Sequence, residues 1–111
     1  MIESVEIVAR YVQHDLKLSS VSEDAAEEVL GDVDELERQL TEWDRQLTDA
    51  VNTLTGTAET IYYRRQGEFR MYFVRRGSTL YCIAVGKRKK TYDRDLSTVI
   101  ERARSLSEDE P

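Results

Sequence analysis

The stretch from Thr60 to Tyr92 reads TIYYRRQGEFRMYFVRRGSTLYCIAVGKRKKTY, and it decides the fold. It contains three runs rich in β-branched and aromatic residues, which favour strands. Two short breaks that carry glycine separate the runs and are typical of tight turns: Gln66-Gly67 and Arg76-Gly77-Ser78. The pattern therefore predicts three consecutive antiparallel strands, and we expect the third strand to end in a basic loop.

Alternation along these strands sorts their side chains between two faces. We expect one face to pack beneath the helices, and it carries Phe69, Met71, Phe73, Tyr81, Ile83 and Val85. The other face combines small residues with Arg and Tyr at the rim: Arg70, Tyr72, Cys82, Ala84 and Arg88. An open face of this kind is able to admit a nucleotide.

The N-terminal segment from Ile2 to Leu18 fits two structures. Its alternating apolar residues are typical of a half-buried strand, whereas Val5, Val8, Val12 and Leu16 also match a helical stripe. Both interpretations stay open. Ser20, with Glu23 three residues later, then predicts a capping box at the start of a helix.

A second apolar pattern follows, with intervals of three and four residues: Val33, Leu36, Leu40, Trp43, Leu47, Ala50 and Leu54. This spacing predicts one long amphipathic helix over residues 33–54. We expect it to lie on the sheet with Trp43 in the core, and a homodimer through this helix is the alternative. Gly56 is predicted to end the helix, and Asp93 to begin a closing helix that reaches Leu106.

These elements predict a single α+β domain over residues 1–111. Its parts are an acidic, mainly helical part (1–56), a basic antiparallel sheet (60–92) covered by a helical pair, and a C-terminal helix (93–106). The chain lacks the apolar run of about 20 residues that a membrane span needs, and it lacks a signal-peptide pattern, so we expect a cytoplasmic protein. One cysteine and one histidine offer no disulfide and no zinc-type ligand set, so we expect no metal and no cofactor.

The net charge of −6 conceals a division of the chain. Residues 1–59 hold 4 Lys and Arg against 15 Asp and Glu, whereas residues 60–104 hold 12 against 4. The acidic part is compatible with a halophile-like, salt-adapted surface or with an ordinary acidic helix face. The basic part is the electrostatic footprint expected of a protein that meets a polyanion.

The cations from Lys87 to Lys90 can neutralise phosphates, and Tyr72 and Tyr92 can stack on bases. A solvated loop that protects a sheet edge is the alternative for the charge run. The sequence contains no Ser-His-Asp set and no glycine-rich phosphate loop before a helix. If the protein cleaves a phosphodiester, it would activate an RNA 2′-hydroxyl without a metal and stabilise the charged phosphorane with Arg and Lys.

Two motifs carry a family likeness. Gly67-Glu68-Phe69-Arg70 and Val85-Gly86-Lys87-Arg88, followed by Tyr92 and a helix, resemble the RelE/ParE toxin superfamily of toxin–antitoxin modules. In that family a Gly-aromatic-Arg strand precedes an apolar strand that ends in Val-Gly-basic-Arg. The segment Leu54-Thr55-Gly56 is similar to the Leu-x-Gly segment of the family, so the resemblance covers about half of the chain, from Leu54 to Leu106.

The resemblance implies a RelE-like fold and a metal-independent endoribonuclease toxin. Members of the family act on mRNA in the ribosomal A site and are silenced by a cognate antitoxin. By this likeness Arg70 and Arg88 would grip the scissile phosphate, and Tyr92 would contact the nucleotide at the cut. The residues expected to hold RNA are Arg64, Arg65, Tyr72, Lys87, Lys89 and Lys90.

RelE-type toxins carry lysines at positions where this chain has Ile61, Tyr62 and Tyr63, so the resemblance assigns no general base. Two alternatives therefore stay open. One is a non-catalytic RelE-fold module that binds nucleic acid or protein, and the other is a ParE-like gyrase inhibitor, because a shared fold does not fix a function.

Overall fold

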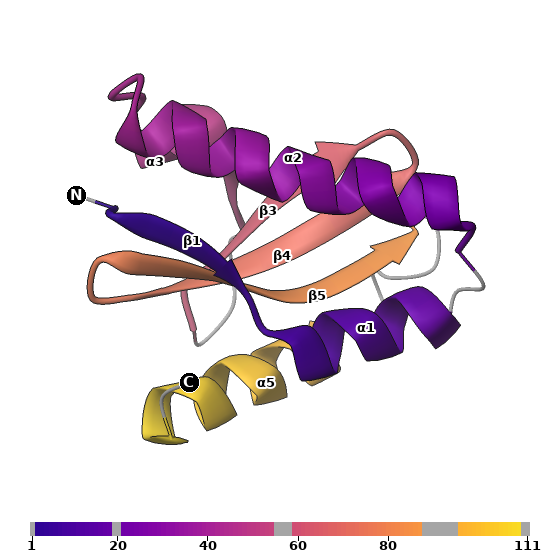
Figure 1. The fold of residues 1–111 in the computed structure, drawn as a ribbon. Helices are drawn as coiled ribbons and strands as arrows, with labels where there is room; N and C mark the ends of the chain where they lie inside the picture. The colour runs from indigo at the N-terminus through magenta and orange to yellow at the C-terminus, as the bar shows by residue number, and fades with distance from the viewer. Residues whose placement is uncertain (1, 19–20, 55–58, 88–95, 110–111) are drawn as a thin grey trace.

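The computed structural model describes residues 2–18, 21–54, 59–87 and 96–109, and these residues form an α+β structure on one five-stranded mixed sheet (Figure 1). The elements follow in the order β1 (Ser4–Ile7), α1 (Ala9–Leu18), α2 (Glu23–Thr41), α3 (Leu47–Ala50), β2 (Asn52–Leu54), β3 (Ile61–Gln66), β4 (Phe69–Arg76), β5 (Thr79–Lys87) and α5 (Leu96–Asp109). Helix α2 lies on one side of the sheet and α5 on the other (Figure 1).

The strands lie in the order β1-β5-β4-β3-β2. Strands β3, β4 and β5 are antiparallel neighbours, joined by two-residue turns in which Gly67 and Gly77 have φ of +60° and +64°. Glycine adopts this left-handed conformation without steric cost. The sheet is larger than the three strands expected, because β2 adds an antiparallel edge beside β3 and β1 adds a parallel edge beside β5.

The N-terminal segment contains both of the structures that its pattern allows. Val5 lies in β1, and Val12 lies on the buried side of α1, so the two apolar periods occupy successive parts of one segment. Strand β1 forms one edge of the sheet, where the Val5 N–H donates to a carboxylate oxygen of Glu37 on α2 at 2.9 Å. This contact covers a backbone group that an edge strand would otherwise offer to another chain.

The prediction of a continuous helix over residues 33–54 is wrong. Helix α2 begins earlier, with Ser22 as the N-cap whose hydroxyl accepts from the Ala25 N–H at 3.2 Å, and it ends at Thr41. The chain then turns at Asp44, whose φ of +52° is left-handed, before α3 and β2. Apolar spacing of three and four residues does not reveal such a break, because the residues on either side keep their spacing. The structure therefore provides no continuous 33–54 helix for the alternative of a homodimer.

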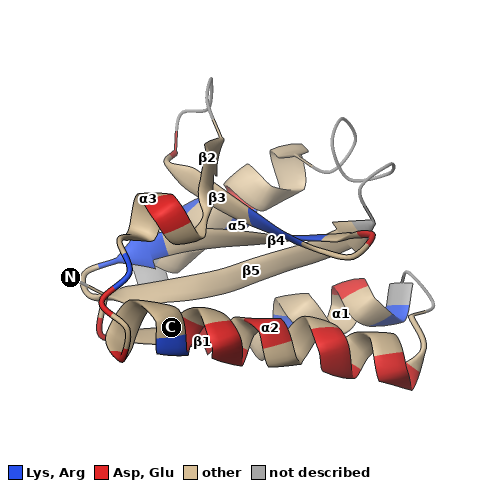
Figure 2. Ribbon diagram, turned by 90° about the horizontal axis from the view of Figure 1, so that it is seen from above, with Lys and Arg blue, Asp and Glu red and all other residues tan. Residues whose placement is uncertain are grey.

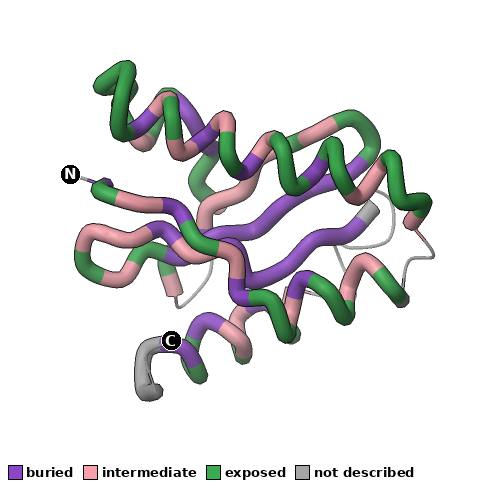
Figure 3. The backbone as a smooth tube through the Cα atoms, in the orientation of Figure 1, coloured by how far each residue is buried: buried purple, intermediate pink, exposed green. Residues whose placement is uncertain are grey.

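Two apolar clusters pack on the two faces of the sheet. The first lies beneath α2 and contains Val29, Val33, Leu36, Leu40, Phe69, Met71, Phe73, Leu80, Cys82 and Val85 among others. The second lies beneath α5 and contains Ile61, Tyr72, Val74, Ile83, Ala84, Val99, Ala103 and Leu106. Most of β4 and β5 is buried (Figure 3), so the open face expected from the sequence is closed.

A β-bulge explains why the predicted faces of β5 are partly wrong. Tyr72 is opposite Ala84 and Phe73 is opposite Cys82, so Ile83 is an extra residue on β5. The extra residue reverses the alternation at this point. Tyr81 and Ile83 consequently join the α5 cluster, whereas Cys82 packs beneath α2 with Phe73.

Charge is divided in space as well as in sequence. The outer surface of α2 carries exposed acids along its length: Glu23, Asp24, Glu27, Glu28 and Asp34. Figure 2 shows these acidic bands on α2 and basic positions on the strands. None of the described helices is long and apolar enough to cross a membrane.

Candidate nucleic-acid interface

The strand register gathers cations at one end of the sheet, which we call the cationic end: Arg65 on β3, Arg70 on β4 and the last residues of β5. Arg65 is directly opposite Arg70, and Arg70 is opposite Gly86 on its other side. Lys87, the last residue of β5, is opposite Phe69 and begins the basic run in the sequence. Three segments that are separate in the sequence therefore meet at this end.

Several of the predicted site residues lie outside the described residues. These are Arg88, Lys89, Lys90 and Tyr92, and for Lys87 the backbone position alone is described. The register nevertheless fixes where the basic run begins, which is one residue past the Gly86 that faces Arg70.

Arg70 is the most constrained member of the cationic end. Its residue is 7% exposed, and its guanidinium carbon lies 4.8 Å from the centre of the Tyr63 ring. A cation over an aromatic face gains about 0.5 to 2 kcal/mol, depending on how far it is desolvated. The ring therefore helps to hold this guanidinium in one place on the α5 side of the sheet, where Tyr63 also packs.

Arg65 differs from Arg70 because it is exposed and forms no ion pair within the described part of the chain. Side chains of directly opposed residues in an antiparallel pair lie on the same face, and like charges in that position destabilise the pair. An anion placed between Arg65 and Arg70 would remove this repulsion.

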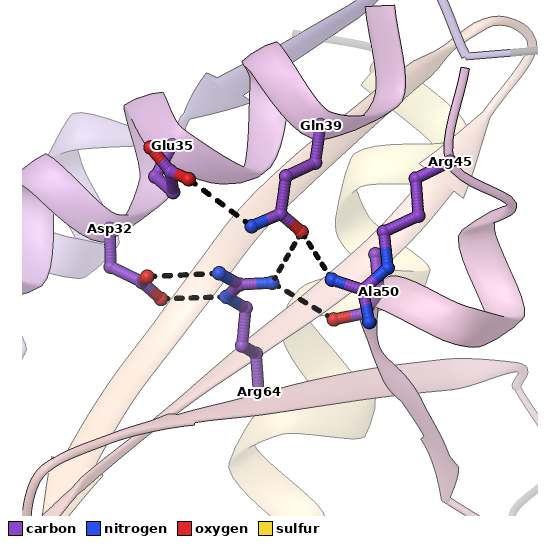
Figure 4. A network of polar contacts seen from close by, with 6 residues as sticks. All are labelled: Asp32, Glu35, Gln39, Arg45, Ala50 and Arg64. Atoms are coloured by element: carbon purple, nitrogen blue, oxygen red, sulfur yellow. Dashed lines mark hydrogen bonds and ion pairs between the residues drawn. The ribbon is translucent and has the colours of Figure 1, made fainter. Parts of the chain in front are cut away.

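The expectation that Arg64 holds RNA is not supported by its position. Its guanidinium forms a bidentate ion pair with Asp32 on α2, at 2.7 and 3.0 Å, and its side chain is 14% exposed (Figure 4). It also donates to the Ala50 carbonyl at 3.0 Å. Alternation along β3 turns Arg64 toward α2 and Arg65 away from it, so the two neighbouring arginines have different roles.

Figure 4 shows how this ion pair continues into a polar network beneath α2. The Gln39 side-chain oxygen accepts from Arg64 at 3.4 Å and from Arg45 at 2.6 Å, while the Gln39 amide nitrogen donates to Glu35. The network joins α2 to β3 and to the segment around α3. Arg64 therefore fastens the helix to the sheet and is not available to a ligand.

Tyr72 also differs from its expected role. It is 2% exposed beneath α5, so a base cannot stack on it in this structure. Cys82, expected on the same open face, is fully buried on the other side, and burial raises the pKa of its thiol to about 12. A thiol in this state is neutral and unreactive at physiological pH.

Sequence reasoning missed an ion pair that supports β5 where it approaches the cationic end. Asp15 on α1 and Arg102 on α5 bind each other in a bidentate pair at 2.8 and 2.9 Å. Asp15 also accepts from the Val85 N–H at 2.9 Å, and Arg102 donates to the Ile83 carbonyl at 2.9 Å. These contacts satisfy the carbonyl of the bulge residue Ile83 and the N–H of Val85, two residues farther along β5, so we call this arrangement the bulge clamp.

The sequence gives little indication of the bulge clamp. Asp15 lies in a segment whose structure was ambiguous, and Arg102 falls on the polar side of a predicted helix, where a solvated cation is ordinary. The Arg102 guanidinium carbon also lies 4.7 Å from the centre of the Tyr11 ring, which adds an aromatic contact to the clamp.

Comparisons with known proteins do not place the chain in a family. No family model matches it, and no curated protein matches it significantly. Within the described ranges, no three His, Cys, Asp or Glu side chains are grouped so that they could hold a metal ion. The features that point to a function are therefore the cationic end and the two motifs that resemble those of the RelE/ParE superfamily.

Proposed function

We propose that the cationic end of the sheet binds the phosphate backbone of single-stranded RNA. One observation carries the proposal: Arg65 and Arg70 are paired across two strands on one face, next to the strand that leads into the basic run. Arg is suited to this task because its planar guanidinium stays charged and can bind two phosphate oxygens at once. Tyr63 holds one of the two cations in place before the ligand arrives.

We further propose that the bound RNA is cleaved, as the RelE resemblance implies. In this reaction the 2′-hydroxyl oxygen attacks the adjacent phosphorus, and the bond from phosphorus to the 5′-oxygen breaks. The 2′-hydroxyl gives up its proton to a base, and the departing 5′-oxygen takes up a proton. Arg70, with Arg88 from the basic run, would stabilise the extra negative charge on the phosphorane.

The biological setting follows from the same resemblance and is part of the proposal. The substrate would be mRNA, bound at the ribosome, and a cognate antitoxin in the cytoplasm would cover the cationic end. An acidic segment of an antitoxin would match the charge of Arg65 and Arg70 as well as a phosphate does.

The test is cleavage of a ribosome-bound message by the purified protein in EDTA. We expect cuts with the unaltered protein and a loss of at least a hundredfold in rate with the Arg70→Gln/Arg88→Gln double variant, which corresponds to about 2.7 kcal/mol of transition-state stabilisation. Arg38→Gln is the matched control, because Arg38 is exposed on α2 and pairs with Glu35. Equal cutting by the double variant would refute the assigned site.

Binding without cleavage is the second candidate. It is favoured by the positions of Arg64 and Tyr72, since neither is available to RNA in the structure. The measurement is fluorescence anisotropy of a short labelled RNA at several salt concentrations. RNA affinity that falls with salt and with Arg65→Gln, in the absence of any cut, would establish the binding module. No affinity for RNA would remove both candidates.

A further inference from the structure

The protein has two adjoining hollows far from the cationic end, beside the turn between β4 and β5. The smaller measures about 170 Å³ and is lined by Ile2, Leu40, Asp44, Arg45, Gln46, Leu47 and Arg75. The larger measures about 460 Å³ and is lined by Glu59, Thr60, Tyr62, Arg75, Arg76 and Gly77. Both hollows are open to the solvent. Arg75 lines both hollows and joins them.

The two hollows contain arginines that are not neutralised. Within the described residues, Arg45 and Arg75 contact no carboxylate, whereas Arg76 pairs with Glu59 at 3.1 Å. Asp44 is the other acid in the linings, so the cations exceed the acids by one. The local charge therefore favours an anion although the protein as a whole is acidic.

These arginines are already positioned. The two terminal nitrogens of Arg45 donate to the Gln39 side chain and to the Asp49 carbonyl, each at 2.6 Å. Arg75 uses its Nε to donate to the Gly77 carbonyl at 2.8 Å, which leaves its two terminal nitrogens for another partner. Side chains that are held before binding lose less conformational entropy when a ligand arrives.

An exposed aromatic residue directly precedes Asp44 and Arg45 in the sequence. Trp43 is 58% exposed, although the sequence pattern placed it in the core, and it directly precedes Asp44 and Arg45 of the smaller hollow. The loop that carries it is fixed by backbone bonds from Trp43 N–H to the Arg38 carbonyl and from Arg45 N–H to the Gln39 carbonyl. The fold therefore holds a large aromatic side chain in water, two residues before Arg45 in the sequence, while Ile2, Leu40 and Leu47 form an apolar floor in the smaller hollow.

We propose that the two hollows form a nucleotide-binding site. Arg75 binds the phosphate through its two terminal nitrogens, and Trp43 stacks on the base above the apolar floor. Aromatic stacking tolerates every base and arginine binds the common phosphate, so the site recognises nucleotides without strong base preference. The site lies at the opposite end of β4 from Arg70, so it does not depend on the proposed ribonuclease function.

Trp43 makes the site directly measurable because it is the one tryptophan of the chain. The experiment titrates its fluorescence emission with ADP. We expect a saturable change with a dissociation constant of about 1 mM or lower, and about tenfold weaker binding for Arg75→Gln. Arg38→Gln, on the surface of α2, should bind ADP as the unaltered protein does. No saturable change, or unchanged binding by Arg75→Gln, would overturn the proposal.

Component ligands test the two halves of the site. Inorganic phosphate and adenosine should each bind more weakly than ADP, and phosphate binding as tight as that of ADP would overturn the role of Trp43. For Trp43→Ala, calorimetry replaces fluorescence and should show weakened ADP binding. Displacement of ADP by a short single-stranded RNA would identify the natural ligand as RNA, whereas ADP that resists displacement would identify a free nucleotide. Loss of ADP binding in Arg65→Gln, with Arg75→Gln unaffected, would refute this site and leave the cationic end in its place.

Discussion

Removal of the Asp15 carboxylate should destabilise the fold strongly, because it accepts three hydrogen bonds from two groups. Asp15 pairs with Arg102 through both oxygens and accepts from the Val85 N–H, and the side chains of the ion pair are each 13% exposed. Breaking a buried ion pair costs about 3 to 5 kcal/mol, and the residual exposure favours the lower value. The Val85 N–H loses its acceptor at a further cost of about 1 kcal/mol. We therefore expect Asp15→Ala to lower the free energy of unfolding by about 3 to 4 kcal/mol.

The measurement is equilibrium unfolding in urea, followed by far-ultraviolet circular dichroism because Trp43 is already exposed in the folded state. Glu35→Ala is the matched control, since it also removes an acid that pairs with an arginine, but at the surface of α2. We expect the control to change stability little. A loss below about 1 kcal/mol for Asp15→Ala would refute the reasoning. Asp15 and Arg102 are partners in one ion pair, so the losses of Asp15→Ala and Arg102→Ala should not add in the double variant. Additive losses would also refute the reasoning.

Three further predictions concern single side chains. Arg64→Ala should lower the free energy of unfolding by about 3 kcal/mol, because it leaves Asp32 without its bidentate partner. Arg65→Ala should change the free energy of unfolding by less than about 0.5 kcal/mol, because Arg65 is exposed. Urea unfolding of the two variants tests both values. The Cys82 thiol should resist alkylation at pH 8 in the native protein and react at once in urea, and comparable rates in both would contradict its burial. Because burial raises the pKa of Cys82 to about 12, the unfolded chain releases the thiol proton at lower pH than the folded chain. Above about pH 9 the free energy of unfolding should therefore fall, relative to Cys82→Ala, by up to about 1.4 kcal/mol per pH unit. An equal difference in stability between the two proteins at pH 8 and at pH 10 would exclude this.

The strands and their turns were predictable because their signals are local. Alternating β-branched and aromatic residues define β3, β4 and β5, and Gly67 and Gly77 supply the left-handed turns between them. The closing helix was also predictable from its apolar period, since Val99, Ala103 and Leu106 are buried. These features need no knowledge of the rest of the chain.

The faces of β5 were not predictable, because the bulge is set by residues far away in the sequence. Asp15 accepts from the Val85 N–H, and Arg102 donates to the Ile83 carbonyl. No local sequence pattern around Ile83 indicates an extra residue there. Alternation counted across the bulge assigns the wrong face to every residue on its far side.

The cationic end was predicted in part, for a related reason. Alternation alone separates Arg65 from Arg64 on β3, but it does not show which face lies against an acid on α2. Asp32 decides this, and it made Arg64 a structural residue. The break after α2 at Asp44 has no local apolar signal either, and it turned Trp43 from an expected core residue into an exposed one.

The acids on α2 are separated in space from cations on the strands, so the molecule has an electric dipole. In the field of a long polyanion such a dipole experiences a torque, so the protein turns its cationic end toward the polymer before contact. The acidic helix then faces the solvent and repels a second polyanion. At physiological ionic strength the orienting field is screened beyond about 8 Å. The orientation therefore arises in the last step of the encounter and weakens as salt is added.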